Sequence, residues 1–223
     1  GNLGPRKDLQ AHLKDPGSPI DPTVIRNLTH YLSAPEWDPI IGRIKNSRLQ
    51  DPSCPVQLIF VPSYLNGNDG IFDKHYYELL CGMDVTVFAS YYEPWGYTPL
   101  ESIAFSVPTI TTTLAGFGLW AAKQREHAGV EIVLRDDYND QEVEDKGVDV
   151  ISRNDTNDSE VVEKISAVLA RFSMMNAAEY DTYRASALEI SKIALWENLI
   201  EFYYRAYDQA LDRMNTRTHR AVY

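Results

Sequence analysis

Cysteine is scarce in this chain, and it contains no long stretch of apolar residues. Cys54 and Cys81 are too few for a disulfide framework, and they lie in no metal-binding spacing. No apolar run approaches the ~20 residues that cross a bilayer. The polar start GNLGPRKDLQ also lacks the apolar core of a signal peptide. These absences argue against a disulfide-stabilised secreted protein and against a membrane protein, and we expect a cytoplasmic location.

Basic residues are also few. Lys and Arg number 21 against 32 Asp and Glu, which gives a formal net charge of −11. Because phosphate backbones and anionic lipid surfaces recruit proteins through clustered Lys and Arg, we expect neither nucleic acid nor membrane partners. Hydrophobic residues (44%) and charged residues (24%) are close to the averages of globular proteins. The length and composition predict a single packed domain over residues 1–223.

Proline punctuates the beginning of the chain. Seven of the 12 prolines lie between positions 5 and 52, which leaves room only for short helices there. We therefore expect residues 1–50 to form a lead-in of loops and short helices. Residues 51–155 are expected to form the core of the domain, and residues 156–215 its terminal helices.

Short runs rich in β-branched residues alternate with helical stretches through the middle of the chain. The runs are Val56–Val61, Val85–Ala89, Thr109–Thr112, Val130–Leu134 and Val148–Ile151. Strands that alternate with helices indicate a parallel sheet. The runs lack polar alternation, which is typical of strands covered by helices on both faces. The predicted fold class is α/β, a Rossmann-like, doubly wound parallel sheet.

The last third of the chain has a helical pattern. Apolar residues recur every three or four positions, which predicts a first amphipathic helix behind an Asn157 cap and a second from about Ala178. A final helix would carry a stripe that includes Trp196, Tyr203 and Tyr207. Such a stripe packs against its own domain or against a second domain.

The segment from Ser90 to Gly118 contains a glycine turn between a predicted strand and a predicted helix. Gly96 can take backbone conformations closed to other residues, and Thr98, Pro99 and Glu101 suit the cap, first and third positions of a helix with a capping box. The unpaired amides at such a helix start, backed by the helix dipole, form a ready anion site. Phosphate is the natural ligand for this site.

Two carboxylates lie on either side of this turn. Glu101 could simply close the capping box, and Glu93 could be a solvated loop residue. Carboxylates beside a phosphate site are nevertheless better suited to accept hydrogen bonds from sugar hydroxyls. The combination suggests a nucleotide sugar, although a strand, a glycine turn and a helix occur in many nucleotide-binding folds.

The same segment resembles a known family signature. The run Tyr91–Pro99, then Glu101, and later Leu114–Gly118 are similar to the signature of glycogen synthases of the animal and fungal type. The resemblance extends from about Asn27 to Leu211. It implies the carboxyl-terminal domain of a retaining glycosyltransferase with the two-domain GT-B architecture.

The resemblance also implies roles for side chains in donor binding. Glu93 would lie against the transferred glucosyl unit, and Glu101 would hold the ribose hydroxyls. Tyr76 falls where the family places a tyrosine against the uracil ring, although an aromatic residue in a helix can also simply pack in the core.

Backbone contacts are implied as well. The amides of Gly96, Tyr97 and Thr98 would contact the phosphates of the donor, which agrees with the anion site argued above from turn chemistry. No metal and no cofactor are called for.

The implied reaction transfers glucose from UDP-glucose to the nonreducing end of an α-1,4-glucan, glycogen, with retention at the anomeric carbon. Nothing in the sequence corresponds to the amino-terminal GT-B domain, so we expect the isolated chain to bind UDP or UDP-glucose at most and to be catalytically inactive. Two alternatives stay open. One is a related GT-B glucosyltransferase that uses ADP-glucose or another acceptor, and the other is a noncatalytic nucleotide- or glucan-binding module.

Overall fold

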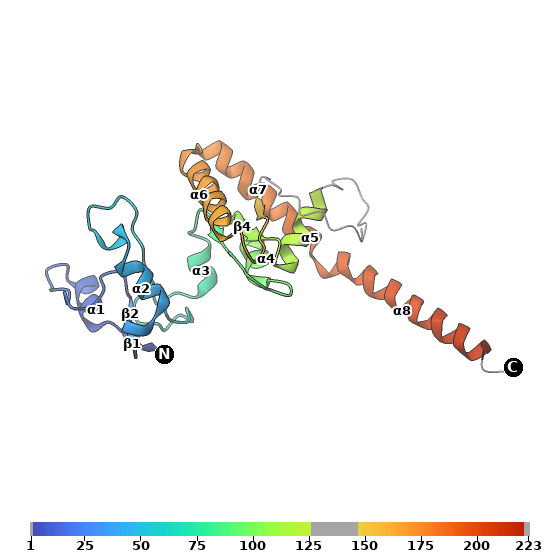
Figure 1. The fold of residues 1–223 in the computed structure, drawn as a ribbon, viewed down its shortest axis with the longest axis horizontal. Helices are drawn as coiled ribbons and strands as arrows, with labels where there is room; N and C mark the ends of the chain where they lie inside the picture. The colour runs from blue at the N-terminus through green and yellow to red at the C-terminus, as the bar shows by residue number, and fades with distance from the viewer. Residues whose placement is uncertain (1, 126–146, 221–223) are drawn as a thin grey trace. The chain divides into compact units, whose positions relative to one another are not determined.

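A computed structural model of the chain describes residues 2–125 and 147–220 (Figure 1). The chain divides into two compact units, Gly1–Leu79 and Leu80–Tyr223. The boundary falls inside the segment 51–155 that the sequence assigns to a single α/β core.

The first unit is built from short elements, as the prolines predict. They are β1 (Asn2–Pro5), α1 (Lys7–Lys14), β2 (His30–Leu32), the 3-10 turn η1 (Pro35–Trp37), α2 (Pro39–Lys45) and the 3-10 turn η2 (Arg48–Gln50). The short helix α3 (Tyr76–Leu80) lies at the boundary with the second unit. The antiparallel pairing of β1 with β2 was not predicted from the sequence. Its two strands are too short to show a hydrophobic period.

A buried arginine holds the first unit together. The side chain of Arg6 is fully buried, and its guanidinium pairs with the carboxylate of Asp8. It also donates to the backbone carbonyls of Ile25 and Leu28, both at 3.0 Å. A buried charge is tolerated only when it is paired and hydrogen-bonded, and Arg6 satisfies both conditions.

The predicted strand Val56–Val61 is wrong. Only Phe60 forms a bridge, in parallel orientation, with Leu28. Val56 and Ile59 are 60% and 62% exposed. The run is apolar, but it has neither a ladder of hydrogen bonds nor a covering helix over its length, so it does not become a strand.

The second unit contains a three-stranded parallel sheet. Strand β3 (Thr86–Val87) pairs with β4 (Thr109–Thr112), and β4 pairs with β5 (Val148–Ile151). The parallel orientation and the bounds of β4 and β5 confirm the sequence prediction, whereas β3 is shorter than the predicted run Val85–Ala89. The predicted strand Val130–Leu134 lies outside the described residues.

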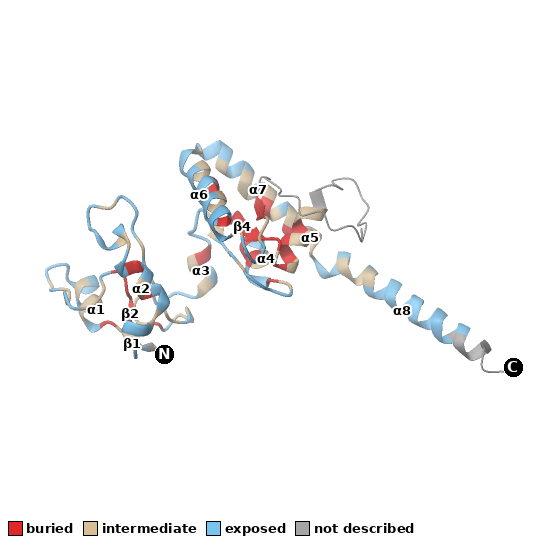
Figure 2. Cartoon of the chain, in the orientation of Figure 1, coloured by how far each residue is buried: buried red, intermediate tan, exposed pale blue. Residues whose placement is uncertain are grey.

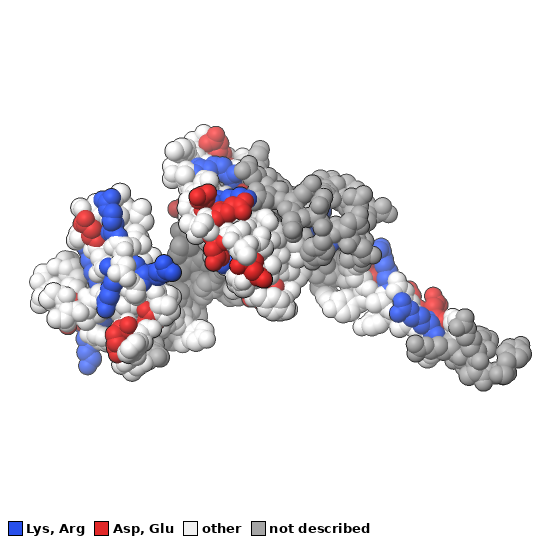
Figure 3. All heavy atoms as spheres, in the orientation of Figure 1, with Lys and Arg blue, Asp and Glu red and all other residues white. Residues whose placement is uncertain are grey.

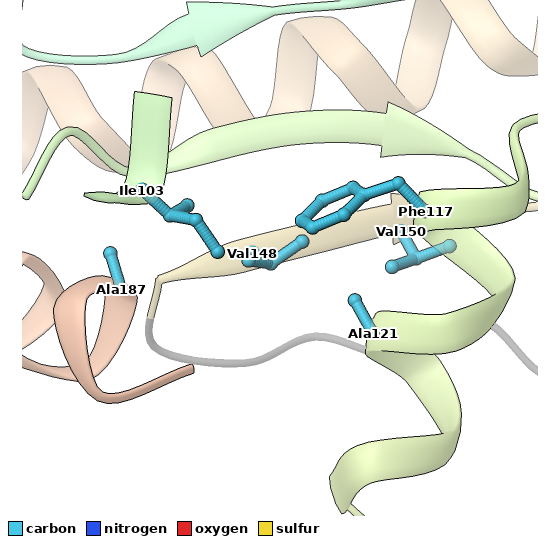
Figure 4. Close-up of a cluster of buried hydrophobic side chains, with 6 residues drawn as sticks. All are labelled: Ile103, Phe117, Ala121, Val148, Val150 and Ala187. Carbon is cyan, nitrogen blue, oxygen red and sulfur yellow. The ribbon is translucent and has the colours of Figure 1, made fainter. Parts of the chain in front are cut away.

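The helices described in the second unit are α4 (Tyr97–Ala104), α5 (Gly116–Arg125), α6 (Asp158–Met174), α7 (Ala177–Ile193) and α8 (Trp196–Arg220). Of these, α4, α5 and α6 contact the sheet, and α7 contacts α4. A buried cluster joins Ile103 of α4, Phe117 of α5, Val148 of β5 and Ala187 of α7 (Figure 4). Figure 2 shows buried residues around β4 and α4, whereas most of α8 is exposed. The described fold is therefore mixed α/β, with one buried cluster between the sheet and α4, α5 and α7 and a second between the sheet and α6.

The three terminal helices confirm the predicted pattern. Helix α6 begins directly after Asn157, although this side chain makes no cap hydrogen bond to the helix. Helix α7 has a full capping box between Asn176 and Glu179, which the sequence analysis missed. On α8 the rings of Trp196 and Tyr203 lie 5.0 Å apart, and both side chains are exposed rather than packed in the core.

Two properties of the described residues concern partners. None of the described helices is both long and apolar enough to cross a membrane. On the visible face, basic side chains lie scattered among acidic ones (Figure 3).

Candidate functional site

The signature segment of the sequence forms a loop at the carboxyl end of the parallel sheet. We call residues 90–96 the signature loop; it runs from just after β3 to the start of α4. Ligands of open α/β sheets bind at this end of the strands. The structure therefore places the predicted site at the edge of the sheet where a ligand is expected.

Backbone hydrogen bonds join the signature loop to the start of α5. The amide of Glu93 donates to the carbonyl of Leu114, and the amide of Gly116 donates to the carbonyl of Glu93, both at 3.1 Å. The amide of Phe117 donates to the carbonyl of Trp95 at 2.6 Å. The two halves of the predicted signature, far apart in the chain, thus form one structural unit.

Aromatic packing fixes the middle of the loop. The ring of Trp95 lies 6.3 Å from that of Phe117 in an edge-to-face arrangement, and 5.9 Å from that of Trp120. Phe117 belongs to the buried cluster of the second unit. Trp95 therefore anchors the signature loop to the core through α5.

Gly96 starts the helix that follows the loop. It has φ +100° and ψ 85°, a left-handed conformation that favours glycine, and it is the N-cap of α4. The predicted cap at Thr98 and the capping box with Glu101 are wrong, because Pro99 occupies the third helical position and Glu101 the fifth. The helix starts earlier because the backbone turns at Gly96.

The corrected helix start keeps the amides on which the predicted anion site depends. The first amides of an α-helix have no acceptor within the helix, and they carry the positive end of its dipole. Here they belong to Tyr97 and Thr98, whose side chains are exposed. Pro99 contributes no N–H group. The amides predicted from the sequence thus lie together at the first turn of α4.

The two predicted carboxylates lie on different sides of this turn. Glu93 is exposed in the signature loop, and a Cβ atom built on Gly96 would lie 3.3 Å from its Cγ, so Glu93 is adjacent to the turn. Glu101 lies in the second turn of α4 and is half-buried. The second unit therefore contains Glu93, Gly96, Tyr97, Thr98 and Glu101.

Tyr76 lies in the first unit. Its amide donates to the carbonyl of Leu65 at 2.9 Å, and its half-buried ring lies 5.4 Å from the ring of Tyr77. Tyr76 therefore belongs to a different unit from the signature loop.

The sequence analysis missed the side chains that follow β5. Arg153 donates from Nη1 to the carbonyl of Ala89 at 2.7 Å. The hydroxyl of Tyr91 donates to a carboxylate oxygen of Asp155 at 2.7 Å, and this hydrogen bond raises the pKa of Tyr91. The available signal was position: Arg153 follows a predicted buried strand, and the carboxyl ends of parallel strands meet at one edge.

Two cavities lie elsewhere. One of about 630 Å³ in the first unit is lined by residues that include His30, Pro62 and Asp69. One of about 430 Å³ in the second unit lies between Val85, Phe172 and Tyr180. Neither is lined by a residue that the sequence analysis assigned to the site. Among the described residues, no group of His, Cys, Asp and Glu is arranged to hold a metal ion.

Comparison with known proteins decides the family. The family model of glycogen synthase matches residues 19–222, nearly the whole chain. The chain belongs to the glycogen synthase family. The matched residues include the signature loop, Gly96 and the start of α5. The structure of this segment is thus that of a glycogen synthase family member.

Individual relatives agree. Glycogen [starch] synthase isoform 1 of Saccharomyces cerevisiae is 40% identical over 129 residues, which cover 55% of this chain and 18% of the yeast protein. Glycogen [starch] synthase of Neurospora crassa is 38% identical over 112 residues, covering 48% of this chain and 16% of that protein. The human liver glycogen [starch] synthase is 35% identical over 114 residues, with 48% and 16% covered. The matched segments thus span less than a fifth of the length of these glycogen synthases.

Proposed function

We propose that this chain supplies the donor-binding site of a glycogen synthase. The observation that carries the proposal is the left-handed Gly96, which starts α4 at the carboxyl end of the parallel sheet with Glu93 beside it. Helix amides of this kind bind phosphate, and a neighbouring carboxylate accepts hydrogen bonds from sugar hydroxyls. A nucleotide sugar combines these two groups.

The proposed fold follows from the family and from the order of elements. In the second unit α4 connects the parallel strands β3 and β4, and α5 follows β4. Such crossovers are the building units of doubly wound sheets. We propose that this unit is part of a Rossmann-like domain, and that the chain is the carboxyl-terminal part of a GT-B glycosyltransferase whose amino-terminal domain completes the active site.

The proposed reaction transfers glucose from UDP-glucose to the nonreducing end of an α-1,4-glucan with retention. The amides of Gly96, Tyr97 and Thr98 would hold the donor phosphates. Glu101 would accept hydrogen bonds from the ribose, and Tyr76 would stack on the uracil.

Glu93 would have the most direct part in the chemistry. Its carboxylate would orient the transferred glucose and favour the positive charge that develops at the anomeric carbon. It would act by position, charge and hydrogen bonds, and would form no covalent bond to the sugar. Its exposure in the loop leaves it accessible to a ligand.

Calorimetric titration with UDP, UDP-glucose and ADP tests the donor site. We expect uridine nucleotides to bind, and Gly96→Val and Tyr76→Ala to weaken the binding. Tyr204→Ala, which removes an exposed ring of α8, is the matched control and should bind normally. Tighter binding of ADP than of UDP would favour an ADP-glucose enzyme instead. The titration is repeated on the complete polypeptide. If the amino-terminal domain supplies part of the site, the isolated chain binds too weakly to detect, and only the complete polypeptide shows the binding.

Kinetics on the complete polypeptide test the carboxylates. Glu93→Gln should lower kcat by about a hundredfold, the scale for loss of one transition-state contact. Glu101→Gln should mainly raise the KM for the donor, because ribose contacts bind substrate and transition state alike. Glu163→Gln, on an exposed face of α6, is the control. Wild-type kinetics for both site variants would contradict the assignment.

A further inference from the structure

The side chain of Arg153, just after β5, contacts the beginning of the signature loop, which follows β3. Strand β4 lies between these two strands in the sheet. The Arg153 side chain is 15% exposed. Besides its hydrogen bond to the carbonyl of Ala89, its guanidinium carbon lies 5.0 Å from the centre of the Tyr91 ring. Arg153 thus contacts the backbone just before the loop and a side chain within it.

Arg153 is itself held in place. Its amide donates to the hydroxyl of Thr113 at 3.0 Å, and that hydroxyl lies 3.4 Å from its carbonyl. Its Nη2 donates to the carboxylate of Asp158 at 2.8 Å. The backbone of Arg153 is therefore held by the residue that follows β4, and its side chain by the first residue of α6.

The loop depends on Arg153 most in its first half. Its second half is joined to the start of α5 by the backbone bonds of Glu93 and Trp95. In the first half, the hydroxyl of Thr112 donates to the carbonyl of Ser90 at 2.7 Å. The amide of Ser90 also donates to the carbonyl of Phe88 at 2.8 Å. Further contacts run from the segment after β5, namely Arg153 to Ala89 and to the ring of Tyr91, and Asp155 to the Tyr91 hydroxyl.

We propose that Arg153 is a positioning residue of the donor site, which sets the path of the signature loop through Ala89 and Tyr91 without itself touching the donor. This inference rests on the proposed function. It assigns to the segment after β5 a role in placing Glu93 and the turn at Gly96. A small misplacement of such groups weakens binding and catalysis, because both depend on geometry.

The chemistry of the contact requires arginine. A planar guanidinium donates hydrogen bonds in two directions and lies flat against an aromatic ring at the same time. A lysine in this position keeps the charge near Asp158 but cannot serve the Ala89 carbonyl, the carboxylate and the ring together. Arg153→Lys therefore separates positioning of the loop from simple charge neutralisation.

The test compares four single variants and one double variant in the complete polypeptide. Arg153→Lys and Arg153→Gln alter the contact itself, and Tyr91→Leu removes the ring. Asp158→Asn removes the charge of the ion pair but keeps an oxygen that can accept the hydrogen bond from Arg153, so the loop contacts stay in place. The affinity for UDP, the KM for UDP-glucose, kcat and the thermal unfolding midpoint are measured for each. A lower unfolding midpoint with unchanged UDP affinity would indicate a purely structural role. A lower UDP affinity would indicate that the signature loop is displaced.

We expect both Arg153 variants and Tyr91→Leu to weaken UDP binding by about fivefold or more, the scale of coupling between neighbouring residues. The double variant Arg153→Lys/Tyr91→Leu should bind no more weakly than the worse single one, because both act through the same contact. Asp158→Asn should bind UDP normally. Should Arg153→Gln fail to fold, Arg153→Lys and Tyr91→Leu give the same test.

The outcomes separate this inference from the proposed function. A wild-type polypeptide that binds no uridine nucleotide overturns the proposed function and the role of Arg153 together. A wild type that binds UDP, with both Arg153 variants binding equally well, overturns only the role of Arg153. Independent, additive losses for Arg153 and Tyr91 would also overturn it, because they would show that the two residues do not act through one contact.

Discussion

The carbonyl oxygen of Pro94 lies so close to the α-carbon of Gly116 that a Cβ atom built there would be 2.3 Å from it. Real Cβ atoms do not come this near to a backbone oxygen. The hydrogen bonds from Gly116 to Glu93 and from Phe117 to Trp95 need this approach. A glycine at position 116 is therefore required for the signature loop to pack against the start of α5.

Gly116→Ala should displace the signature loop, although Gly116 is not proposed to touch the ligand. The added methyl must push the Pro94 carbonyl away, and overpacking of this kind costs about 1–3 kcal/mol in free energy of unfolding. Chemical unfolding and UDP titration of the same variant measure the two effects, and we expect both stability and affinity to fall.

Gly42→Ala is the control for this substitution. Gly42 lies in α2, and a Cβ built on it has no atom within 4 Å. Alanine is favoured over glycine in a helix by roughly 0.5–1 kcal/mol, so this variant should be as stable as the wild type or more so. Equal effects of the two substitutions would mean that the Pro94 contact is unimportant.

Gly96→Ala should weaken UDP binding because alanine is strained at φ +100° and its methyl would approach the Cγ of Glu93. Left-handed backbone costs a non-glycine residue roughly 1–2 kcal/mol. Gly4→Ala supplies the control, since Gly4 has φ +104° with nothing within 4 Å of the added atom. We expect both variants to lose stability and only Gly96→Ala to lose affinity in the titration. Loss of affinity in both would point to a general effect of strain.

The parts of the fold that the sequence predicts are those governed by local pattern. β4 and β5 have the expected bounds, because each is buried along its whole length and its apolar or β-branched run has no exposed residue to blur its ends. The run Val56–Val61 is also rich in apolar and β-branched residues but is no strand, since only Phe60 forms a bridge. Composition indicates that a strand is possible, but the strand forms only where another segment of the chain pairs with it along its length.

The start of α4 shows the same limit within the site. Thr98, Pro99 and Glu101 match the statistics of a capped helix, but the close approach of Pro94 and Gly116 brings the chain to its turn at Gly96. The contact of Arg153 with Ala89 spans 64 positions. It depends on the strand order β3-β4-β5, which a single sequence does not reveal.

Tyr180→Phe should loosen the attachment of α7 to the sheet. The Tyr180 hydroxyl donates to the carbonyl of Asp84 at 2.7 Å, just before β3, and burial raises its pKa. Its loss should cost about 1 kcal/mol in free energy of unfolding, the usual net value of one hydrogen bond. Tyr204→Phe, on the exposed face of α8, is the control for chemical unfolding. Equal stability of Tyr180→Phe and the wild type would show that this hydrogen bond is dispensable.

The pair of Arg6 and Asp8 should make the first unit sensitive to acid. The hydrogen bond from Arg6 lowers the pKa of Asp8 from 3.8 to about 2, and the amide of Asp21 contributes. A carboxylate whose pKa is lower in the folded state stabilises the fold above its unfolded pKa, and this stabilisation is lost as pH falls through the folded pKa. The window therefore lies between about pH 4 and pH 2, and the stabilisation is on the order of 2 kcal/mol.

Asp8→Asn should remove this acid-dependent step and also lower stability at neutral pH, because Arg6 stays buried without its counter-charge. Hydrogen exchange of the amides of Leu28 and Thr29, measured at neutral pH and at about pH 3, reports the first unit alone. Asp51→Asn is the control, since the Asp51 side chain is exposed and its carboxylate accepts hydrogen bonds from Ser53, two positions along the chain. If these amides exchanged in Asp8→Asn at the wild-type rate at both pH values, the ion pair would be unimportant to the fold of this unit.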